Sequence, residues 1–490
     1  MAKPREIFIE TIVIDPDDEQ PKFQQLYRQI REQIVNRTLA AGTRLPSTRK
    51  LAKDLAISRN TTTTAYEQLA SEGYIETRQC SVARVANLPE VADETVDKPL
   101  ARLEETLASR GRELVSLPHQ TGYSSGYRLQ PGLPDAREFP FNIWRRLVAE
   151  QMRHSPGESF GYHSYAGHQR LREVVASYMQ SSRGISCKVD QVMITSGAQS
   201  AFNLLSHLLI DTGDSVLFEE PGYTGAQGAF LAAGGRLRPL RVHGRSWEVE
   251  AVLTEKPKVI YVTPSCQFPL GATMRIEERL QILKHAQDVG AWIIEDDFDS
   301  EFRFHSNRVP TLQSADTSKR TIYVGTFAKT MLPDLRLGFI VFPGEVDKSI
   351  RKTNFLMGSS APLVFQAALA DFIEQGYFAR HTRRMKRIYQ ARRTILDKAL
   401  HENLSDWMEQ VDEGNGLQST WRFREAADDV EITRRAVGIG ISPTALSIHY
   451  RHDRPEHGFM VGYAATSDAA ILRSVESFRT IVEGSLGRRA

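Results

Sequence analysis

The stretch TIYVGTFAKT, residues 321–330, places a lysine just after an apolar run that is typical of a buried strand. Burial lowers the pKa of an amine, and an amine with a lowered pKa is a nucleophile that forms an imine with an aldehyde. Taken alone, Lys329 is more simply explained as a surface residue or one half of an ion pair. The residues at the ends of the other strands therefore decide its role.

Further apolar runs alternate with helix-length amphipathic segments on both sides of this stretch. They are VMIT (192–195), SVLFEE (215–220), KVIYVT (258–263), AWIIEDD (291–297) and GFIVF (338–342). Nearly continuous apolar strands of this kind predict an α/β fold with a mainly parallel sheet covered by helices on both faces. Such sheets bind ligands at the carboxyl ends of their strands.

Two of these strand ends carry groups that suit a phosphorylated pyridine. Asp296 closes the run AWIIEDD, and a carboxylate there can hold a protonated pyridine nitrogen. The run VMIT is followed by the start of a predicted helix, whose free N–H groups and dipole suit a phosphate. The residues of this phosphate cradle are Ser196, Gly197, Ala198 and Gln199.

Three more residues complete the predicted site. Thr326 and Arg336 flank Lys329 and add a hydroxyl and a bidentate guanidinium for an anion, and Tyr223 offers a ring to stack on a pyridine. Separately, such residues are explained as a helix cap, a tight turn or core. Together they predict a site for pyridoxal 5′-phosphate with Lys329 as its covalent anchor.

The N-terminal region has a different character. Residues 44–75, RLPSTRKLAKDLAISRNTTTTAYEQLASEGYI, predict two helices separated at Ala56-Ile57, with Ser58 as N-cap of the second. Leu51, Leu55, Ala65 and Leu69 are the expected core contacts. Between residues 22 and 85 there are eleven Lys/Arg and five Asp/Glu, an excess of +6 that favours contact with phosphates. A helical hairpin with a solvated polar face is the simpler alternative.

Composition sets the limits of the whole chain. Its 490 residues suggest two to four domains, and 41% apolar with 25% charged residues are typical of a soluble protein. No signal or membrane segment is evident, so we expect a cytoplasmic protein. The three cysteines are widely spaced and argue against a disulfide framework or a zinc site, so no metal is expected. Residues 86–118, with four acids in LPEVADETVD, predict a linker between domains 1–85 and 119–490. Within this linker, residues 100–114 predict a short exposed helix that carries Leu103 and Leu107.

The N-terminal strings have a family resemblance. PKFQQLYRQIREQI, AAGTRLPSTRKLAKDL and SRNTTTTAYEQLASEGYIETR together resemble the winged helix-turn-helix of GntR-type transcription regulators. The resemblance implies that operator DNA is contacted by Arg44, Ser47 and Arg49 and by the head of the recognition helix, Ser58, Arg59, Asn60 and Thr61. It departs from the family at the wing, where Cys80 and Val82 replace the expected glycines and resist a positive φ.

The rest of the chain has a second resemblance. LQPGLPDAREFP, GYHSYAGHQRLRE, TSGAQSA, EEPGY, IIEDDFDSEFRF and GTFAKTMLPDLRLG are similar to the fold type I, aspartate-aminotransferase-like family. This implies pyridoxal 5′-phosphate on Lys329, a smaller C-terminal α+β subdomain and a head-to-tail homodimer. The fusion of both parts resembles the MocR subfamily of regulators.

Several positions leave the aminotransferase pattern. Phe298 stands where a tyrosine is expected to bond the cofactor's phenolic oxygen, and Cys266 where such regulators carry a histidine. Met460 stands at the arginine that clamps a substrate carboxylate, with Arg451 or Arg454 as alternative anchors. The resemblance also implies that Tyr162 serves the partner subunit's site.

Three functions remain open at this stage. The preferred one is a regulator that holds pyridoxal phosphate, binds operator DNA and senses an amine or amino-acid effector. The second is an active aminotransferase whose N-terminal head only localises or dimerises it. The third is a regulator that senses pyridoxal phosphate itself.

Overall fold

The computed structural model describes residues 11–77, 82–88, 106–118, 127–154, 165–304, 310–346, 348–412, 414–452 and 455–487. The chain divides into two compact units, Met1–Arg102 and Leu103–Ala490. Among the residues described, no helix is long and apolar enough to cross a membrane. Cys80, Tyr162 and Arg454, with the tip of the expected wing and much of the expected linker, lie outside the described residues.

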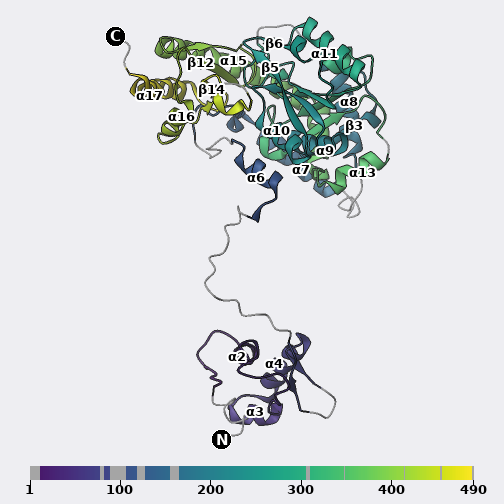
Figure 1. Ribbon diagram of the computed structural model, residues 1–490, viewed down its shortest axis with the longest axis vertical. Helices are drawn as coiled ribbons and strands as arrows, with labels where there is room; N and C mark the ends of the chain where they lie inside the picture. Colours follow the sequence, from purple (N-terminus) through teal and green to yellow (C-terminus); the bar gives the residue numbers. More distant parts are fainter. Residues whose placement is uncertain are drawn as a thin grey trace. The chain divides into compact units, whose positions relative to one another are not determined.

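The first unit is a small helical domain with a two-stranded hairpin (Figure 1). Its elements are α2 (Lys22–Val35), α3 (Thr48–Asp54), α4 (Arg59–Ser71), β1 (Ile75–Glu76) and β2 (Arg84–Val85). Leu51, Ala65 and Leu69 are buried in its core as expected, while Leu55 is only partly buried. Ala56 separates α3 from α4 with a φ of 52°, which ends the first helix and sets the angle of the second.

The second unit is built on an eight-stranded sheet with the order β3-β10-β9-β8-β7-β4-β5-β6. The strands are β3 (Val192–Thr195), β4 (Ser215–Glu220), β5 (Arg236–His243), β6 (Ser246–Trp247), β7 (Val259–Val262), β8 (Trp292–Asp297), β9 (Thr321–Thr326) and β10 (Gly338–Val341). Strands β5, β4, β7, β8 and β9 are parallel, whereas β10 runs antiparallel between β9 and β3. The α/β class and the mainly parallel sheet predicted from the sequence are confirmed.

Helices cover both faces of this sheet (Figure 1). They are α6 (Ser109–Ser116), α7 (Phe141–His154), α8 (Gln169–Arg183), α9 (Ala198–Leu209), α10 (Thr224–Ala232), α11 (Ile276–Val289), α12 (Leu312–Ala315), α13 (Lys348–Leu356) and α14 (Leu363–Glu374). On β9, Tyr323 packs toward α7, α8 and α14, while Ile322 and Val324 pack toward α9 and α10. This alternation is why the strand sequence is apolar at every position.

Single-turn 3-10 helices lie in the connections. They are η1 (Ala136–Glu138), η3 (Val189–Gln191), η4 (Val249–Val252), η5 (Ser300–Phe302), η6 (Pro333–Leu335) and η7 (Ser447–His449).

The short helix expected over 100–114 is only partly within the described residues, since 100–105 with Leu103 lie outside them. The described part contains helix α6, Ser109–Ser116, and Leu114 and Leu117 pack against the apolar core beside α10. These two leucines approach Gly228 of α10. Part of the segment predicted as a linker is therefore docked on the second unit.

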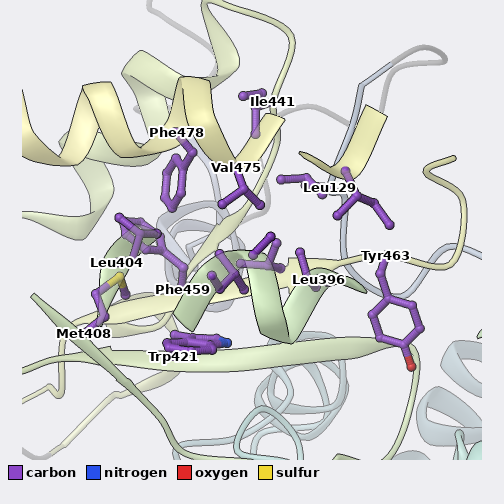
Figure 2. Packing of buried hydrophobic residues seen from close by; sticks show 14 of the residues in the cluster. Leu129, Leu396, Leu404, Met408, Trp421, Ile441, Phe459, Tyr463, Val475 and Phe478 are labelled. Carbon is purple, nitrogen blue, oxygen red and sulfur yellow. The ribbon is translucent and has the colours of Figure 1, made fainter. Parts of the chain in front are cut away.

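The C-terminal part of the second unit is a small α+β subdomain. Its sheet has the order β11-β12-β14-β13, with β11 (Met408–Gln410), β12 (Gln418–Phe423), β13 (Thr444–Ala445) and β14 (Gly458–Gly462), and its helices are α15 (Tyr377–Leu404), α16 (Asp429–Val437) and α17 (Asp468–Leu486). Figure 2 shows its core, where Trp421 and Phe459 meet Leu404 and Phe478 between the sheet and the helices. Leu129, far away in the sequence, completes this core and fixes the segment that enters the site.

Candidate functional site

A cavity of about 230 Å³ opens at the carboxyl edge of the large sheet. The ends of β3, β8 and β9 meet there, and β10 starts there because it runs the other way, with Gly338 opposite both Thr195 and Thr326. The nine residues predicted from the sequence all line this cavity, namely Ser196, Gly197, Ala198, Gln199, Tyr223, Asp296, Thr326, Lys329 and Arg336.

Lys329 follows β9 in the turn that leaves the sheet. Its side chain is half-buried, and Nζ donates to the carbonyl oxygen of Gly132 at 2.7 Å. Burial lowers the pKa of the Lys329 amine below its ordinary value, and the carboxylates of Asp299 and Asp296 oppose that shift. Gly132 has a φ of +71°, and a Cβ there would lie 2.8 Å from Nζ, so any other residue would strain the backbone and displace the amine.

Asp296 lies at the floor of the cavity. One carboxylate oxygen accepts from the hydroxyl of Tyr261 at 2.6 Å, whereas Oδ1 is buried and has no partner among the residues that the structure describes. Burial raises the pKa of the Asp296 carboxyl to about 7, and the Tyr261 hydroxyl opposes the shift. A buried acceptor without a donor is costly, so this oxygen is suited to a cationic N–H donor from a ligand.

The predicted cradle has the geometry of an anion site. Gly197 is the N-cap of α9 and no side chain in the described part of the chain caps this helix, which leaves its first N–H groups facing the cavity. The adjoining Gly338 is required because a Cβ there would lie 2.8 Å from the backbone carbon of Gly197. Arg336 is exposed beside the cradle and forms no ion pair with the residues that the structure describes. Thr326 Oγ1 accepts from the N–H of Ala328 at 3.1 Å.

Aromatic rings form one wall. Tyr223 packs edge-on against Phe268 with centroids 5.4 Å apart, and Phe268 packs in the same way against Phe298 at 5.8 Å. Phe298 lines the cavity and brings no hydroxyl, so the phenolic donor expected at this position is missing. Only Tyr223 and Phe298 were singled out from the sequence.

Sequence reasoning missed two polar residues that the fold brings to the site. Asp299 is 1% exposed, and burial raises the pKa of its carboxyl to about 7. The positive charge of the nearby Lys329 opposes this shift. Its Oδ2 accepts from the N–H of Leu417 at 3.0 Å and so holds the start of β12, where Gln418 reaches the cavity. Asp299 was within the quoted string IIEDDFDSEFRF, but nothing marked Gln418.

Two residues that depart from the expected pattern, Met460 and Cys266, are buried. Met460 is fully buried behind Gln418, whose amide nitrogen lies 3.3 Å from its sulfur. Cys266 is buried, and burial raises the pKa of its thiol well above the ordinary value. Arg451 does not line the cavity, since its guanidinium pairs with Glu113 at 2.6 Å.

In the first unit, the predicted DNA-contacting residues gather around the N-termini of α3 and α4. Ser47 and Ser58 cap these helices by accepting from the N–H groups of Lys50 and Thr61. Arg44, Ser47, Arg49, Ser58, Arg59 and Asn60 are exposed, and Thr61 is half-buried. Val82 does not adopt a positive φ. An exposed, polar helix start of this kind fits a major groove.

Both parts of the chain match known families. Residues 22–85 match "Bacterial regulatory proteins, gntR family" and residues 135–430 match "Aminotransferase class I and II". Among solved structures, a kynurenine aminotransferase of Pyrococcus horikoshii is 25% identical with a TM-score of 0.69, covering 81% of this chain and 99% of that chain. An archaeal alanine:glyoxylate aminotransferase has a TM-score of 0.72 at 22% identity, covering 79% of this chain and all (100%) of the other.

Curated relatives match along almost the whole length. A protein of Rhizobium meliloti named "Probable rhizopine catabolism regulatory protein MocR" is 40% identical over 96% of this chain and 95% of its own. The pyridoxine biosynthesis transcriptional regulator PdxR of Corynebacterium glutamicum is 28% identical over 93% of this chain and 94% of its own. The chain therefore belongs to the MocR subfamily of GntR-type transcription regulators, which join a winged helix-turn-helix to an aminotransferase-like domain.

Proposed function

We propose that this chain is a transcription regulator that holds pyridoxal 5′-phosphate on Lys329. Its affinity for operator DNA changes when an amine effector enters the same cavity. The observation that carries the proposal is the convergence of nine sequence-predicted residues on one cavity. The kynurenine aminotransferase of similar fold was solved in complex with PMP, which supports a B6 cofactor at this edge of the sheet.

The residues present fit this cofactor. The partnerless Oδ1 of Asp296 would accept from the pyridine nitrogen, and the uncapped start of α9 with Arg336 would bind the phosphate. Tyr223 would lie against the ring, and Lys329 would hold the aldehyde carbon. When bound, pyridoxal phosphate supplies an aldehyde that condenses reversibly with primary amines. Burial of the Lys329 amine favours its neutral form, which is the form that reacts.

DNA recognition belongs to the first unit. Arg59 and Asn60 stand exposed at the start of α4, where a guanidinium suits guanine and an amide suits adenine. Arg44 and Arg49 would contact phosphates and set the register. The carboxyl half of α4 packs into the core of the unit through Ala65, Tyr66 and Leu69, which holds the helix in place.

Helix α6 offers a route between the cavity and the DNA-binding unit. Glu113 of α6 pairs with Arg451, and the backbone N–H of Arg451 donates to Glu220 at 3.0 Å. Glu220 lies three residues before Tyr223, in the segment EEPGY that enters the cavity. A ligand that moves Tyr223 would thereby alter how α6 is held, and α6 is joined through the chain to the first unit.

The second unit also carries an exposed apolar patch that suits a homodimer. Tyr165, Phe355, Leu356 and Met357 are 41%, 41%, 67% and 41% exposed, and the carbonyl of the nearby Ser359 accepts from the N–H of Ser196 in the cradle. A second copy covering this patch would therefore lie next to the cofactor site. Sedimentation at micromolar concentration tests this, and a monomer would contradict it.

An active aminotransferase is the less favoured function. Met460 cannot replace a guanidinium fork, and Arg451 is engaged with Glu113, so an amino-acid carboxylate lacks its usual anchor among the described residues. Rapid multi-turnover exchange between an amino acid and a keto acid would reverse this preference.

The test is DNA binding with and without the cofactor. The full-length protein is titrated on the promoter upstream of its own gene at a fixed salt concentration, with and without pyridoxal phosphate. We expect a yellow protein whose DNA occupancy responds to the cofactor or to an added amine, and Lys329→Ala should lose both the colour and the response. Lys256→Ala, at an exposed lysine outside the cavity, is the control. A response that survives in Lys329→Ala would refute the proposal.

A further inference from the structure

Resting on the proposed function, we propose that the effector is a primary amine whose neighbouring polar group is uncharged, a hydroxyl or an amide, and that Gln418 recognises this group. Such a ligand differs from an α-amino acid in lacking a carboxylate beside the amine. The charges around the cavity and the placement of one amide favour such a ligand.

Among the described residues, the cavity lining offers no spare cation for a carboxylate. Of the described residues that line it, only Lys329 and Arg336 are cationic. Lys329 is the anchor itself, and Arg336 lies on the cradle side, its backbone 4.0 Å from the point where a Cβ on Gly197 would lie. A carboxylate placed near Lys329 would also face Asp296 and Asp299.

Two further guanidiniums of the described residues, those of Arg303 and Arg393, are engaged elsewhere. Arg303 is 8% exposed and donates to the carbonyl oxygen of Ser265 at 3.2 Å and to Thr273 Oγ1 at 3.3 Å. Arg393 donates to the carbonyl oxygen of Gln418 itself at 2.6 Å and pairs with buried acids. Neither lines the cavity, so a carboxylate would lose its water without gaining a charged partner.

Gln418 is a polar side chain on the cavity wall where a cation would be needed to bind a carboxylate. Its amide nitrogen lies 3.3 Å from the Met460 sulfur, a weak acceptor that leaves most of the amide's hydrogen-bonding capacity unused. Its Oε1 lies 4.0 Å from the point where a Cβ on Gly132 would stand, and Gly132 is the residue whose carbonyl holds Lys329 Nζ. The amide therefore faces the same opening as the reactive amine.

The backbone that carries this amide is held in place from several sides. Asp299 accepts from the N–H of Leu417, the hydroxyl of Tyr463 donates to the carbonyl of Gly416, and Gln418 pairs with Gly462 across β12 and β14. The side-chain amide of Gln418 offers a donor and an acceptor, and a hydroxyl or another amide uses both. A carboxylate uses only the donor and keeps an uncompensated charge.

Serinol and L-serine form a matched pair of probes, because they differ only in a hydroxymethyl group against a carboxylate. Each is titrated into full-length protein loaded with pyridoxal phosphate, and both the visible spectrum and promoter occupancy are followed. We expect serinol to half-saturate at a roughly tenfold or more lower concentration than L-serine, because the carboxylate of L-serine would lose its water without gaining a charged partner. Equal or tighter binding of L-serine would overturn the inference.

Variants at Gln418 separate recognition from structure. Gln418→Leu should weaken serinol roughly tenfold while the spectrum of the loaded protein is kept, and Gln418→Arg should shift the preference toward L-serine. Gln375→Arg, at an exposed glutamine outside the cavity, should leave the preference unchanged. An unchanged order of the two probes in Gln418→Arg overturns the inference.

The proposed function and this inference fail in different ways. A loaded protein with no visible band would refute the attachment to Lys329, and the effector class would fall with it. A normal band that neither probe alters would overturn the effector class alone.

Discussion

Replacing Asp296 by asparagine should stabilise the cofactor-free protein, and do so more at high pH. The pKa of this carboxyl is raised by burial from 3.8 to about 7, so folding disfavours its charged form. Burying a carboxyl whose pKa is raised by folding costs least stability at a pH below its pKa in the unfolded chain. The cost grows as the pH rises and levels off above the pKa in the folded protein. The loss of stability therefore develops between about pH 4 and pH 7.

The size of the effect follows from these two pKa values. Linkage gives a cost of about 2 kcal/mol at pH 5 and about 4 kcal/mol at pH 8 relative to a neutral side chain. An amide of the same shape escapes this cost, because Tyr261 can still donate to its oxygen. The free energy of unfolding of Asp296→Asn minus that of the unchanged protein should thus rise by roughly 2–3 kcal/mol from pH 5 to pH 8.

The assay is urea unfolding of dialysed, cofactor-free protein at both pH values, following the transition of the larger unit. Asp316→Asn is a matched control, because hydrogen bonds to Ser318, Arg320 and Thr321 hold the pKa of Asp316 below its ordinary value despite partial burial. Its variant should lose the same stability at pH 5 and pH 8, both of which lie above that pKa. A difference for Asp296→Asn that does not change with pH would refute the claim that burial penalises this carboxylate.

Other predictions concern the phosphate cradle, helix α6 and the DNA-binding first unit. Gly338→Ala should lower the affinity for pyridoxal phosphate measured by absorbance titration, because its Cβ would lie 2.8 Å from the backbone of Gly197, whereas Gly344→Ala, with nothing within 4 Å, should bind normally. Glu113→Gln should weaken the effect of an amine on promoter occupancy by up to roughly fivefold, since an exposed ion pair contributes about 1 kcal/mol at most, and an unchanged response would exclude the α6 route. Arg59→Ala should abolish the preference for the promoter over unrelated DNA in a mobility-shift assay while leaving salt-sensitive loose binding, and a retained preference would contradict its role as a base reader.

Much of the large sheet could be predicted because its central strands are apolar on both faces. The run VMIT became β3 and AWIIEDD became β8 with almost the same limits. Strand β5 was not predicted, because Arg236, Arg238 and Arg241 alternate with buried residues near the edge of the sheet. An edge strand that faces solvent lacks the continuous apolar signal of a central one.

The site was predictable where its residues follow strands. Asp296 and Lys329 were brought together because β8 and β9 are adjacent parallel strands, and their carboxyl ends must meet. Gly132 and Gln418 were not predicted because they come from distant segments, which the C-terminal core fixes through Leu129 and β12. No local pattern reports such long-range packing.

Helix α6 shows the same limit on a smaller scale. The helix expected over 100–114 overlaps α6, which continues to Ser116, where Leu114 and Leu117 approach Gly228 of α10. Tertiary contact decides between weak local signals.

The attachment of the cofactor to Lys329 is the central claim and can be measured directly. Full-length protein saturated with pyridoxal phosphate is reduced with borohydride, digested and mapped by mass spectrometry. The account predicts that the peptide containing Lys329 carries the mass of one pyridoxyl phosphate and that no other lysine is modified to a comparable extent. An unmodified Lys329, with the label absent or on another lysine, would contradict it.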